Sequence, residues 1–185
     1  MSSIIPREIS PFSSLSDMQK FVARNAELID EYLRLSEIYW SLPTDEIGSW
    51  SQLSNYWSVN GEIFENLCLQ ALENDGWDLD ILPDADNPRA VNRKVSFVVD
   101  DITFNTEADF IGTKNGKISY FEAKRNPKTE LKPNQKRIAG MIGEGGEIVV
   151  EGTPITPDSF FKLTTHDKGA TISMETVPHH ALVLR

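Results

Sequence analysis

The strongest chemical signal in the sequence is a pair of acidic residues on either side of an Asn-Gly dipeptide. Asn115-Gly116 separates two runs of alternating polar and apolar residues, and this pattern predicts a two-residue hairpin turn because both turn residues must take positive φ. In that register Asp109 faces Glu122, with the Cβ atoms roughly 5 Å apart. Two opposed carboxylates repel each other, whereas a divalent cation between them would stabilise both.

The same register assigns the neighbouring side chains to two faces of the hairpin. Glu107 and Lys124 join the two acids on one face. The opposite face, which we expect to point into a core, consists of Ala108, Phe110, Phe121 and Ala123. A solvated strand face with two cross-strand ion pairs is the alternative interpretation. The acids stand beside large apolar residues, and buried charge persists when it is paired or binds a metal, so the pattern favours a site.

The chain has a net charge of −10, but its positive charge is concentrated around this hairpin. Residues 1–86 contain 4 Lys and Arg against 16 Asp and Glu, residues 87–137 contain 11 against 6, and residues 138–185 contain 3 against 6. Basic residues beside a metal site suit a phosphate-backbone substrate, because they replace its condensed counterions. The alternative is that basic loops only balance an acidic fold. The candidate nucleic-acid contacts are Arg125, Lys128, Lys132, Lys136 and Arg137.

The length and composition limit the kind of protein that this can be. With 185 residues, of which 39% are hydrophobic, the chain can form one core with a small extension. The single cysteine, Cys68, lies in a helical run and is expected to be a buried thiol. The sequence has no basic N-terminal segment before an apolar core, and no stretch approaches the roughly 20 apolar residues that span a bilayer. We therefore expect a soluble protein with a cytoplasmic site of action.

Hydrophobic periodicity and turn residues predict the elements that must position these side chains. The spacing of apolar residues in 14–42 is typical of a helix with Ser16 as its N-cap, and Pro43 ends it. Further helices are expected at 59–74 and 134–142. Strands are expected at 77–82, at 94–99, after a turn at Asp100-Asp101 through both arms of the Asn-Gly hairpin, and at 148–150.

This order of elements, with an acid on the second helix and an Asp…Glu-x-Lys pattern on the hairpin, resembles the PD-(D/E)xK nuclease superfamily. The resemblance covers about residues 58–152. Its motifs are residues 61–65, 107–109, 122–124 and 135–136, and Ala108 stands where the family pattern has proline. It implies a mixed α/β (α+β) fold with a restriction-endonuclease-like core, in which helices flank a central mixed sheet in the order α-β-β-β-α-β. The nuclease domain would span residues 58–185, after a helical extension at 1–57.

The resemblance also implies roles for individual residues. Asp109 and Glu122 would bind Mg²⁺ or Mn²⁺ through hard carboxylate oxygens, and Glu65 would supply a further ligand or orient a water molecule. Lys124 would hold the attacking water or stabilise the transition state as a point charge. Gln135 resembles a position that contacts the site or the substrate in some relatives. Glu62, three residues before Glu65, is the second choice for the helical acid.

Residues 131–150 are more loosely similar to toxin domains of contact-dependent growth inhibition proteins. This similarity implies a nuclease that a larger carrier delivers and that a cognate inhibitor protein neutralises. A non-catalytic interaction module and a host-defence or repair nuclease are the alternatives, and both DNA and RNA are open as substrates, with DNA favoured. An aromatic group could form a binding surface, although core packing is the default interpretation; its members are Trp40, Trp50, Tyr56 and Trp57.

Overall fold

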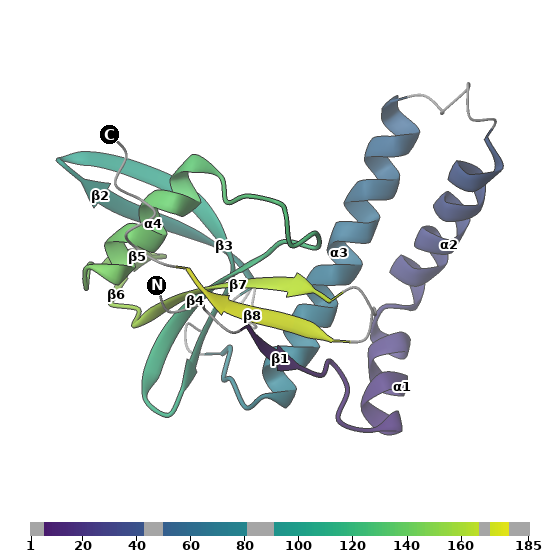
Figure 1. The fold of residues 1–185 in the computed structure, drawn as a ribbon, viewed down its shortest axis with the longest axis horizontal. Coiled ribbons are helices and arrows are strands. Elements are labelled where there is room, and N and C mark those ends of the chain that lie inside the picture. Colours follow the sequence, from purple (N-terminus) through teal and green to yellow (C-terminus); the bar gives the residue numbers. More distant parts are fainter. Residues whose placement is uncertain (1–5, 43–49, 81–90, 167–170, 178–185) are drawn as a thin grey trace.

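The computed structural model of the chain describes residues 6–42, 50–80, 91–166 and 171–177. Within these residues it contains four helices and one eight-stranded mixed sheet, so the chain is a mixed α and β protein (Figure 1). None of the helices in the described part of the chain combines the length and the apolar character that a membrane span requires.

The sheet has the strand order β1-β8-β7-β4-β3-β2-β5-β6. Its centre is an antiparallel meander of three strands, β2, β3 and β4, and β7 lies parallel to β4 on the far side. The connection from β4 to β7 contains α4 and the hairpin of β5 and β6. The strands are β1 (Arg7–Ile9), β2 (Val91–Val99), β3 (Ile102–Lys114), β4 (Lys117–Ala123), β5 (Ile148–Val150), β6 (Thr153–Ile155), β7 (Ser159–Thr165) and β8 (Ile172–Thr176).

Two helices contribute apolar side chains to two cores. α3 (Trp50–Asn74) supplies Phe64, Cys68 and Leu72 to a core that also contains Phe110 and Phe121 from the sheet. α4 (Pro133–Gly143) supplies another apolar set to a second core, which consists of strand and helix residues including Val95, Phe97, Ala108, Tyr120, Ile138 and Ile142. The sheet is therefore buried by α3 through one core and by α4 through the other.

The two predicted turns of the meander are confirmed. Asp100 and Asp101 have φ of 50° and 63°, and Asn115 and Gly116 have φ of 54° and 74°. Asn, Asp and Gly tolerate this left-handed conformation, which the tight two-residue turn requires. The Asn-Gly turn also sets the predicted register, from Lys114 opposite Lys117 as far as Phe110 opposite Phe121.

The N-terminal region differs from the prediction in three ways. The helix expected over 14–42 is two helices, α1 (Leu15–Arg24) and α2 (Ala26–Ser41), which meet at Asn25. The N-cap is Ser14, whose hydroxyl accepts the N–H of Asp17, and not Ser16. The boundary expected between residues 57 and 58 falls inside α3, and β1 pairs with β8 in the main sheet. Pro43 lies outside the described residues.

The strand predictions are right in the meander and incomplete elsewhere. Residues 77–80 form only an isolated bridge, Asp78 with Thr113, where a strand over 77–82 was expected, and residues 81–82 lie outside the description. Residues 148–150 form β5 as predicted, but β5 pairs with β2. The strand beside β4 is β7, and the sequence patterns predicted neither it nor β1, β6 and β8.

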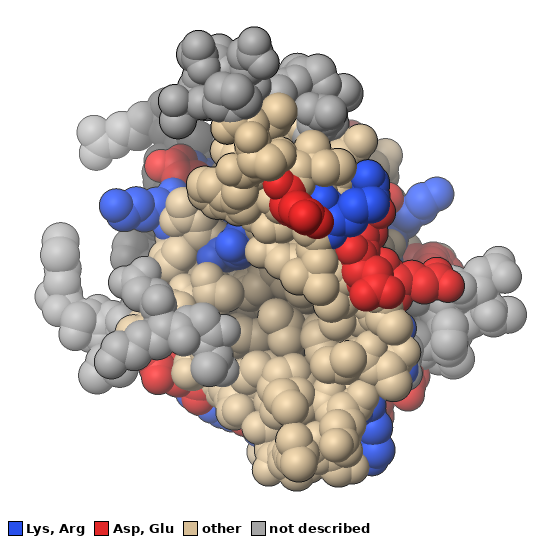
Figure 2. Space-filling model, turned by 90° about the vertical axis from the view of Figure 1, so that its right-hand side faces the viewer, with Lys and Arg blue, Asp and Glu red and all other residues tan. Residues whose placement is uncertain are grey.

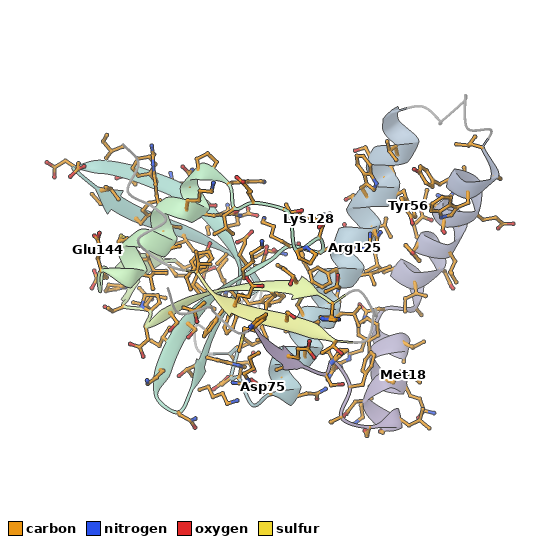
Figure 3. All side chains as sticks on the ribbon, in the orientation of Figure 1. Met18, Tyr56, Asp75, Arg125, Lys128 and Glu144 are labelled. Atoms are coloured by element: carbon orange, nitrogen blue, oxygen red, sulfur yellow. The ribbon has the colours of Figure 1, made fainter. Side chains whose placement is uncertain are left out.

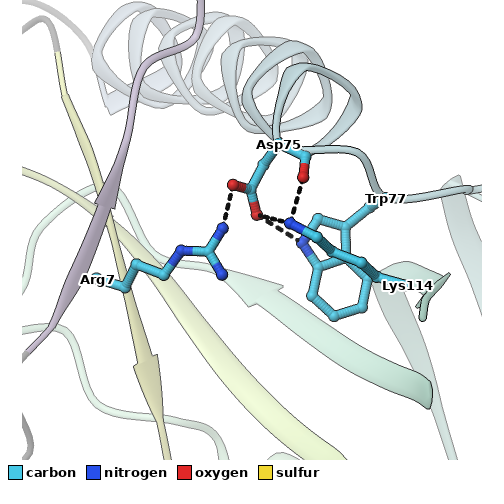
Figure 4. A network of polar contacts seen from close by, with 4 residues as sticks. All are labelled: Arg7, Asp75, Trp77 and Lys114. Atoms are coloured by element: carbon cyan, nitrogen blue, oxygen red, sulfur yellow. Dashed lines mark hydrogen bonds and ion pairs between the residues drawn. The ribbon is translucent and has the colours of Figure 1, made fainter. Parts of the chain in front are cut away.

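A polar network joins three distant segments at the turn end of the hairpin (Figure 4). Asp75, just after α3, accepts a hydrogen bond from Trp77 Nε1 at 3.0 Å and pairs with Lys114 Nζ at 3.1 Å. Its other carboxylate oxygen pairs with Arg7 of β1, and its carbonyl oxygen accepts a hydrogen bond from Lys114. This network holds β1, the end of α3 and the β3–β4 turn together.

Candidate active site at the fork of β3 and β4

Strands β3 and β4 stop pairing where the predicted acids stand. The last register pair is Phe110 with Phe121, and the next residue on each strand is Asp109 and Glu122. The N–H of Ala123 donates a hydrogen bond to Asp109 Oδ2 at 2.7 Å. A side-chain carboxylate thus binds the backbone of β4 at this position, and Asp109 lies in the fork between the strands.

The alternation of side chains on β3 also breaks at Asp109. Ala108 belongs to the core under α4, whereas Phe110 belongs to the core under α3. We predicted that both would share one face, and that prediction is wrong. Asn92 on β2 stands between the register partners of Ala108 and Phe110, and it has φ of 53°. The backbone irregularity at Asp109 explains how its carboxylate can interact with groups from α3 as well as from the α4 side.

Glu122 is only 3% exposed and has two hydrogen-bond donors on one oxygen. Lys124 Nζ donates to Glu122 Oε1 at 2.9 Å, and Gln135 Nε2 donates to the same atom. The Gln135 side chain is held in turn, because its Oε1 accepts the N–H of Lys132 at 2.7 Å at the start of α4. The second oxygen, Glu122 Oε2, is buried and receives no hydrogen bond from the described residues.

Burial and mutual repulsion make both carboxylates of the fork hard to ionise. Burial, followed by the charge of Asp109, raises the pKa of Glu122 to about 8, although Lys124 opposes this shift. Burial also raises the pKa of Asp109, and the Ala123 N–H and Lys124 oppose the shift. The two carboxyls also act on each other's pKa. Without a cation, the pair is therefore poised to share a proton at neutral pH.

Glu65 lies on α3 near this pair. Burial, then the charges of Asp109 and Glu62, raises the pKa of Glu65 to about 7, while Lys124 and a hydrogen bond from Asn92 oppose the shift. Glu62 is exposed, and the electrostatic link to Asp109 favours Glu65 as the helical acid of the site. Asn92 is a site neighbour that sequence reasoning missed. The strand was expected to begin at Lys94, whereas β2 begins at Val91, so Asn92 lay outside the predicted strand.

Glu107 does not join the other acids. It is exposed and stands opposite Lys94 in the register of β2 and β3, so its place on the acidic face was predicted incorrectly. The backbone carbonyl of Glu107 instead accepts a hydrogen bond from Tyr120 Oη at 3.3 Å.

Cys68 lies beneath the site, as a buried thiol, in agreement with the sequence-based expectation. Burial, with the nearby charges of Asp109 and Glu65, raises the pKa of this thiol well above its usual range. A thiol that resists ionisation is a poor nucleophile, so the reactive groups of this region are the carboxyls and Lys124.

The donor set fits a hard divalent cation held by two carboxylates. Asp109 is half-buried beside the buried Glu122, and Glu122 Oε2 is a buried oxygen that no described donor satisfies. Carboxylate oxygens are the ligands that Mg²⁺ and Mn²⁺ prefer. Over the described ranges, no three His, Cys, Asp or Glu side chains form a group suited to a metal ion. Glu65 therefore stands near the pair without completing a three-acid centre.

The five predicted nucleic-acid contacts fall into two groups. Arg125, Lys128 and Lys132 are exposed, and the charge of Lys132 acts on Asp109. Lys136 pairs with Glu130 at 3.1 Å. Arg137 is half-buried, and its guanidinium lies 4.3 Å from the centroid of the Phe104 ring.

Comparisons with known proteins found no matching family model, no matching curated protein and no matching solved structure.

Proposed function

We propose that the protein is a metal-dependent phosphodiesterase that hydrolyses nucleic acid. The observation that supports this proposal is the pair of the half-buried Asp109 and the buried Glu122, with Lys124 bound to one oxygen of Glu122. A structural role does not require this arrangement, because two adjacent buried carboxylates destabilise each other unless something neutralises them. A divalent cation would supply that neutralisation.

The order of the central elements supports the resemblance to the PD-(D/E)xK superfamily. α3, the β2–β3–β4 meander, α4 and the parallel strand β7 follow one another in the order α-β-β-β-α-β. The β5–β6 hairpin is an insertion at the outer edge of the meander. The acids lie at the fork of the second and third strands, and Gln135 lies in the first turn of the following helix. This agreement of order and side-chain contact adds to the sequence motifs.

Asp109 and Glu122 would hold the cation, which would neutralise charge on the scissile phosphate and acidify a water molecule. Gln135 and Lys124 orient Glu122 by donating to its Oε1, which directs Oε2 away from these two donors. The Ala123 N–H fixes the Asp109 carboxylate in the fork. The protein thus presents the two acids in a defined orientation before any ligand binds, which reduces reorganisation during the reaction.

Lys124 and Glu65 have the properties of the two remaining catalytic groups. Lys124 is a point charge beside the site and can stabilise negative charge that develops on phosphate oxygens. A carboxyl whose pKa is raised to about 7 can accept and release a proton at neutral pH. Glu65 is therefore suited to take a proton from the attacking water or return one to the leaving group.

The surroundings of the site suit a polyanion. Arg125, Lys128 and Lys132 are exposed in or next to the segment that joins β4 to α4. The first turn of α4 lies beside Glu122 through Gln135, and the N-terminus of a helix attracts phosphate through its backbone N–H groups and dipole. These groups would bind phosphates on either side of the scissile bond.

The direct test is a cleavage assay on the purified full chain. Plasmid DNA, a single-stranded oligonucleotide and transfer RNA would each be incubated with Mg²⁺, with Mn²⁺ and with EDTA. We expect cleavage of at least one substrate with either cation and none in EDTA, and Glu122→Gln should be inactive under all conditions. Full turnover of the wild type in chelator, or equal activity of Glu122→Gln, would exclude this mechanism.

The toxin setting belongs to the same proposal. An active nuclease harms the cell that makes it, and exposed basic residues next to the site would be accessible to an acidic inhibitor protein. Expression of the wild type without an inhibitor should arrest bacterial growth, whereas Glu122→Gln should be tolerated at the same protein level. Normal growth with active wild-type enzyme would favour a repair or defence nuclease instead.

A further inference from the structure

Helix α3 extends beyond the segment that packs on the sheet (Figure 1). Its residues Trp57, Gly61, Phe64 and Cys68 are spaced by four, three and four positions, which places them on one face of the helix. Phe64 and Cys68 are buried in the core between α3 and the sheet. Trp57 and Gly61 therefore continue the sheet-facing side of α3 toward its N-terminus.

Among the described residues, nothing fills the space beside Gly61, between Trp57 and the candidate active site. A Cβ atom added at Gly61 would meet no heavy atom of the described part of the chain within 4 Å, and Trp57 is 54% exposed. Glu65 follows Gly61 by one helical turn and interacts with Asp109. The expectation of core packing holds for Tyr56, which is buried, but not for Trp57 or Trp40, and the Trp50 side chain lies outside the description.

Basic residues approach the same helix from the loop after β4. Arg125 directly follows Lys124, is exposed, and acts electrostatically on Tyr32 of α2. Tyr32 stacks on Tyr56 of α3, with ring centroids 5.7 Å apart. Arg125 and Lys128 lie on the loop that points toward α3 in Figure 3. Arg125 therefore lies between the active site and the part of α3 that contains Trp57.

We propose that this surface, defined by Trp57, Gly61 and Arg125, binds an unpaired nucleic-acid strand that leads into the active site. A base can stack on an exposed indole only if its own face is uncovered, and in a duplex the neighbouring pairs cover it. The open space at Gly61 gives the strand room beside the helix, and Arg125 binds its phosphates. The inference specifies the substrate of the proposed nuclease. It rests on that proposed function, because only an active site gives the bound strand its direction.

An apolar face elsewhere provides a matched control. Figure 2 shows a broad uncharged area on the side of the molecule where α1 lies, next to acidic and basic side chains. On α1, Leu15, Met18 and Val22 are exposed at helical spacing. Met18→Ala removes exposed apolar surface without affecting the proposed strand-binding surface.

Binding would be measured on the full-length protein in EDTA, so that cleavage does not interfere. The probe is a fluorescein-labelled 15-nucleotide strand, alone or annealed to its complement, followed by anisotropy. We expect tighter binding of the single strand than of the duplex. Trp57→Leu should weaken single-strand binding by about five-fold or more, in line with the loss of one base–aromatic stack. Met18→Ala should bind like the wild type.

Gly61→Leu gives a second, independent test. Glycine is unfavourable inside a helix, so this substitution should keep or raise the melting temperature while its side chain fills the open space. Cleavage of the oligonucleotide should fall by about ten-fold or more, because the loss of one stack alone corresponds to about five-fold. Met18→Ala should cleave the oligonucleotide at the wild-type rate.

The possible outcomes separate this inference from the proposed function. If the wild type cleaves nucleic acid but Trp57→Leu and Gly61→Leu bind and cleave normally, the strand path is overturned and the nuclease remains. Equal binding of duplex and single strand also overturns it. If single-strand binding depends on Trp57 and no substrate is cleaved, the proposed reaction fails and the binding surface stands.

Discussion

The β3–β4 hairpin has a charged cluster at each end, and the two clusters differ in how their oxygens are satisfied. At the turn end, Asp75 has donors on both carboxylate oxygens, from Arg7 on one and from Lys114 and Trp77 on the other (Figure 4). At the open end, Glu122 has two donors on Oε1 and none from the described chain on Oε2.

The difference in hydrogen bonding to the carboxylate oxygens indicates that the two clusters have different roles. A carboxylate surrounded by donors is stabilised in its charged form and fixes the elements around it. Two acids that repel each other and leave an oxygen unsatisfied cost stability, and this cost is typical of binding and catalytic sites. The turn-end cluster therefore belongs to the architecture of the fold, whereas the fork cluster is prepared for a ligand.

The largest effect should come from exchanging one acid in each cluster for its amide. Asp109→Asn should reduce cleavage by at least about 1000-fold, because it removes a charged ligand of the proposed cation. This loss of rate is as large as the loss that follows removal of one preorganised oxyanion donor. Asp75→Asn should leave kcat within about two-fold, because this residue only supports the fold. Cleavage of a labelled oligonucleotide in Mg²⁺, with both variants checked by circular dichroism, measures the contrast.

The same pair of variants should reverse order in a stability measurement without metal. An Asn at position 109 can still accept the Ala123 N–H and can donate its amide hydrogen to Glu122, which replaces repulsion by a hydrogen bond. We expect its melting temperature in EDTA to equal or exceed that of the wild type at pH 8. A large loss of stability for Asp109→Asn would mean that the fork is a structural cluster like the other one.

How far the sequence could predict this contrast depends on the range of the interactions. The Asn115-Gly116 turn sets its register locally, so the approach of Asp109 and Glu122 followed from the order of residues alone. The fork itself did not, because it depends on a hydrogen bond between the Asp109 side chain and the β4 backbone. Alternation therefore failed at Asp109 and misplaced Glu107.

The second-largest effect concerns the pH dependence of stability without metal. The pKa values of Glu122 and Glu65 are raised to about 8 and about 7, above the ordinary value of 4.5, so the folded protein binds more protons than the unfolded chain between these limits. Their contribution to stability is complete below pH 4.5 and is lost as pH rises toward 8. Urea unfolding in EDTA at pH 5.5, 7 and 8.5 should therefore show decreasing stability.

Matched variants and added metal give this prediction its controls. Glu122→Gln and Glu65→Gln should each flatten the decrease between pH 5.5 and 8.5, whereas the exposed Glu107→Gln should not. Mg²⁺ should stabilise the wild type more at pH 8.5 than at pH 5.5, because the ligands must lose their protons to bind it. A wild-type stability that rises over this range would contradict the assigned pKa shifts.

The third effect is the stability of the turn-end cluster. Asp75→Asn removes the charge that pairs with Arg7 and Lys114 and should lower the free energy of unfolding by about 1–3 kcal/mol. Asp78→Asn is the control, because its exposed side chain only accepts the N–H of Asp80 at 2.9 Å, which an amide oxygen can also do. Equal melting temperatures for the two variants would show that the network does not stabilise the fold.

In the rest of the fold, the sequence did not predict which strands pair when they are far apart in the chain. β7 lies parallel to β4 although α4 and the β5–β6 hairpin separate them in sequence, and neither strand's side-chain pattern identifies its partner. The edge strand β1 joins the sheet through β8 from the opposite end of the chain. For this reason the sequence did not predict that β1 joins the main sheet.

The smallest predicted effect separates two basic residues near the fork that sequence reasoning had grouped together. Lys128 is exposed on the loop after β4, so Lys128→Ala should leave the melting temperature unchanged and reduce the slope of log Kd against log salt by about one. Arg137 packs on the Phe104 ring, so Arg137→Ala should lower stability by about 0.5–1 kcal/mol with a smaller change in slope. Binding titrations at several salt concentrations, together with thermal melts, measure both quantities. If Arg137→Ala changed the slope as much as Lys128→Ala and left the melt unaltered, its guanidinium would belong to the nucleic-acid interface and not to the packing of α4 on β3.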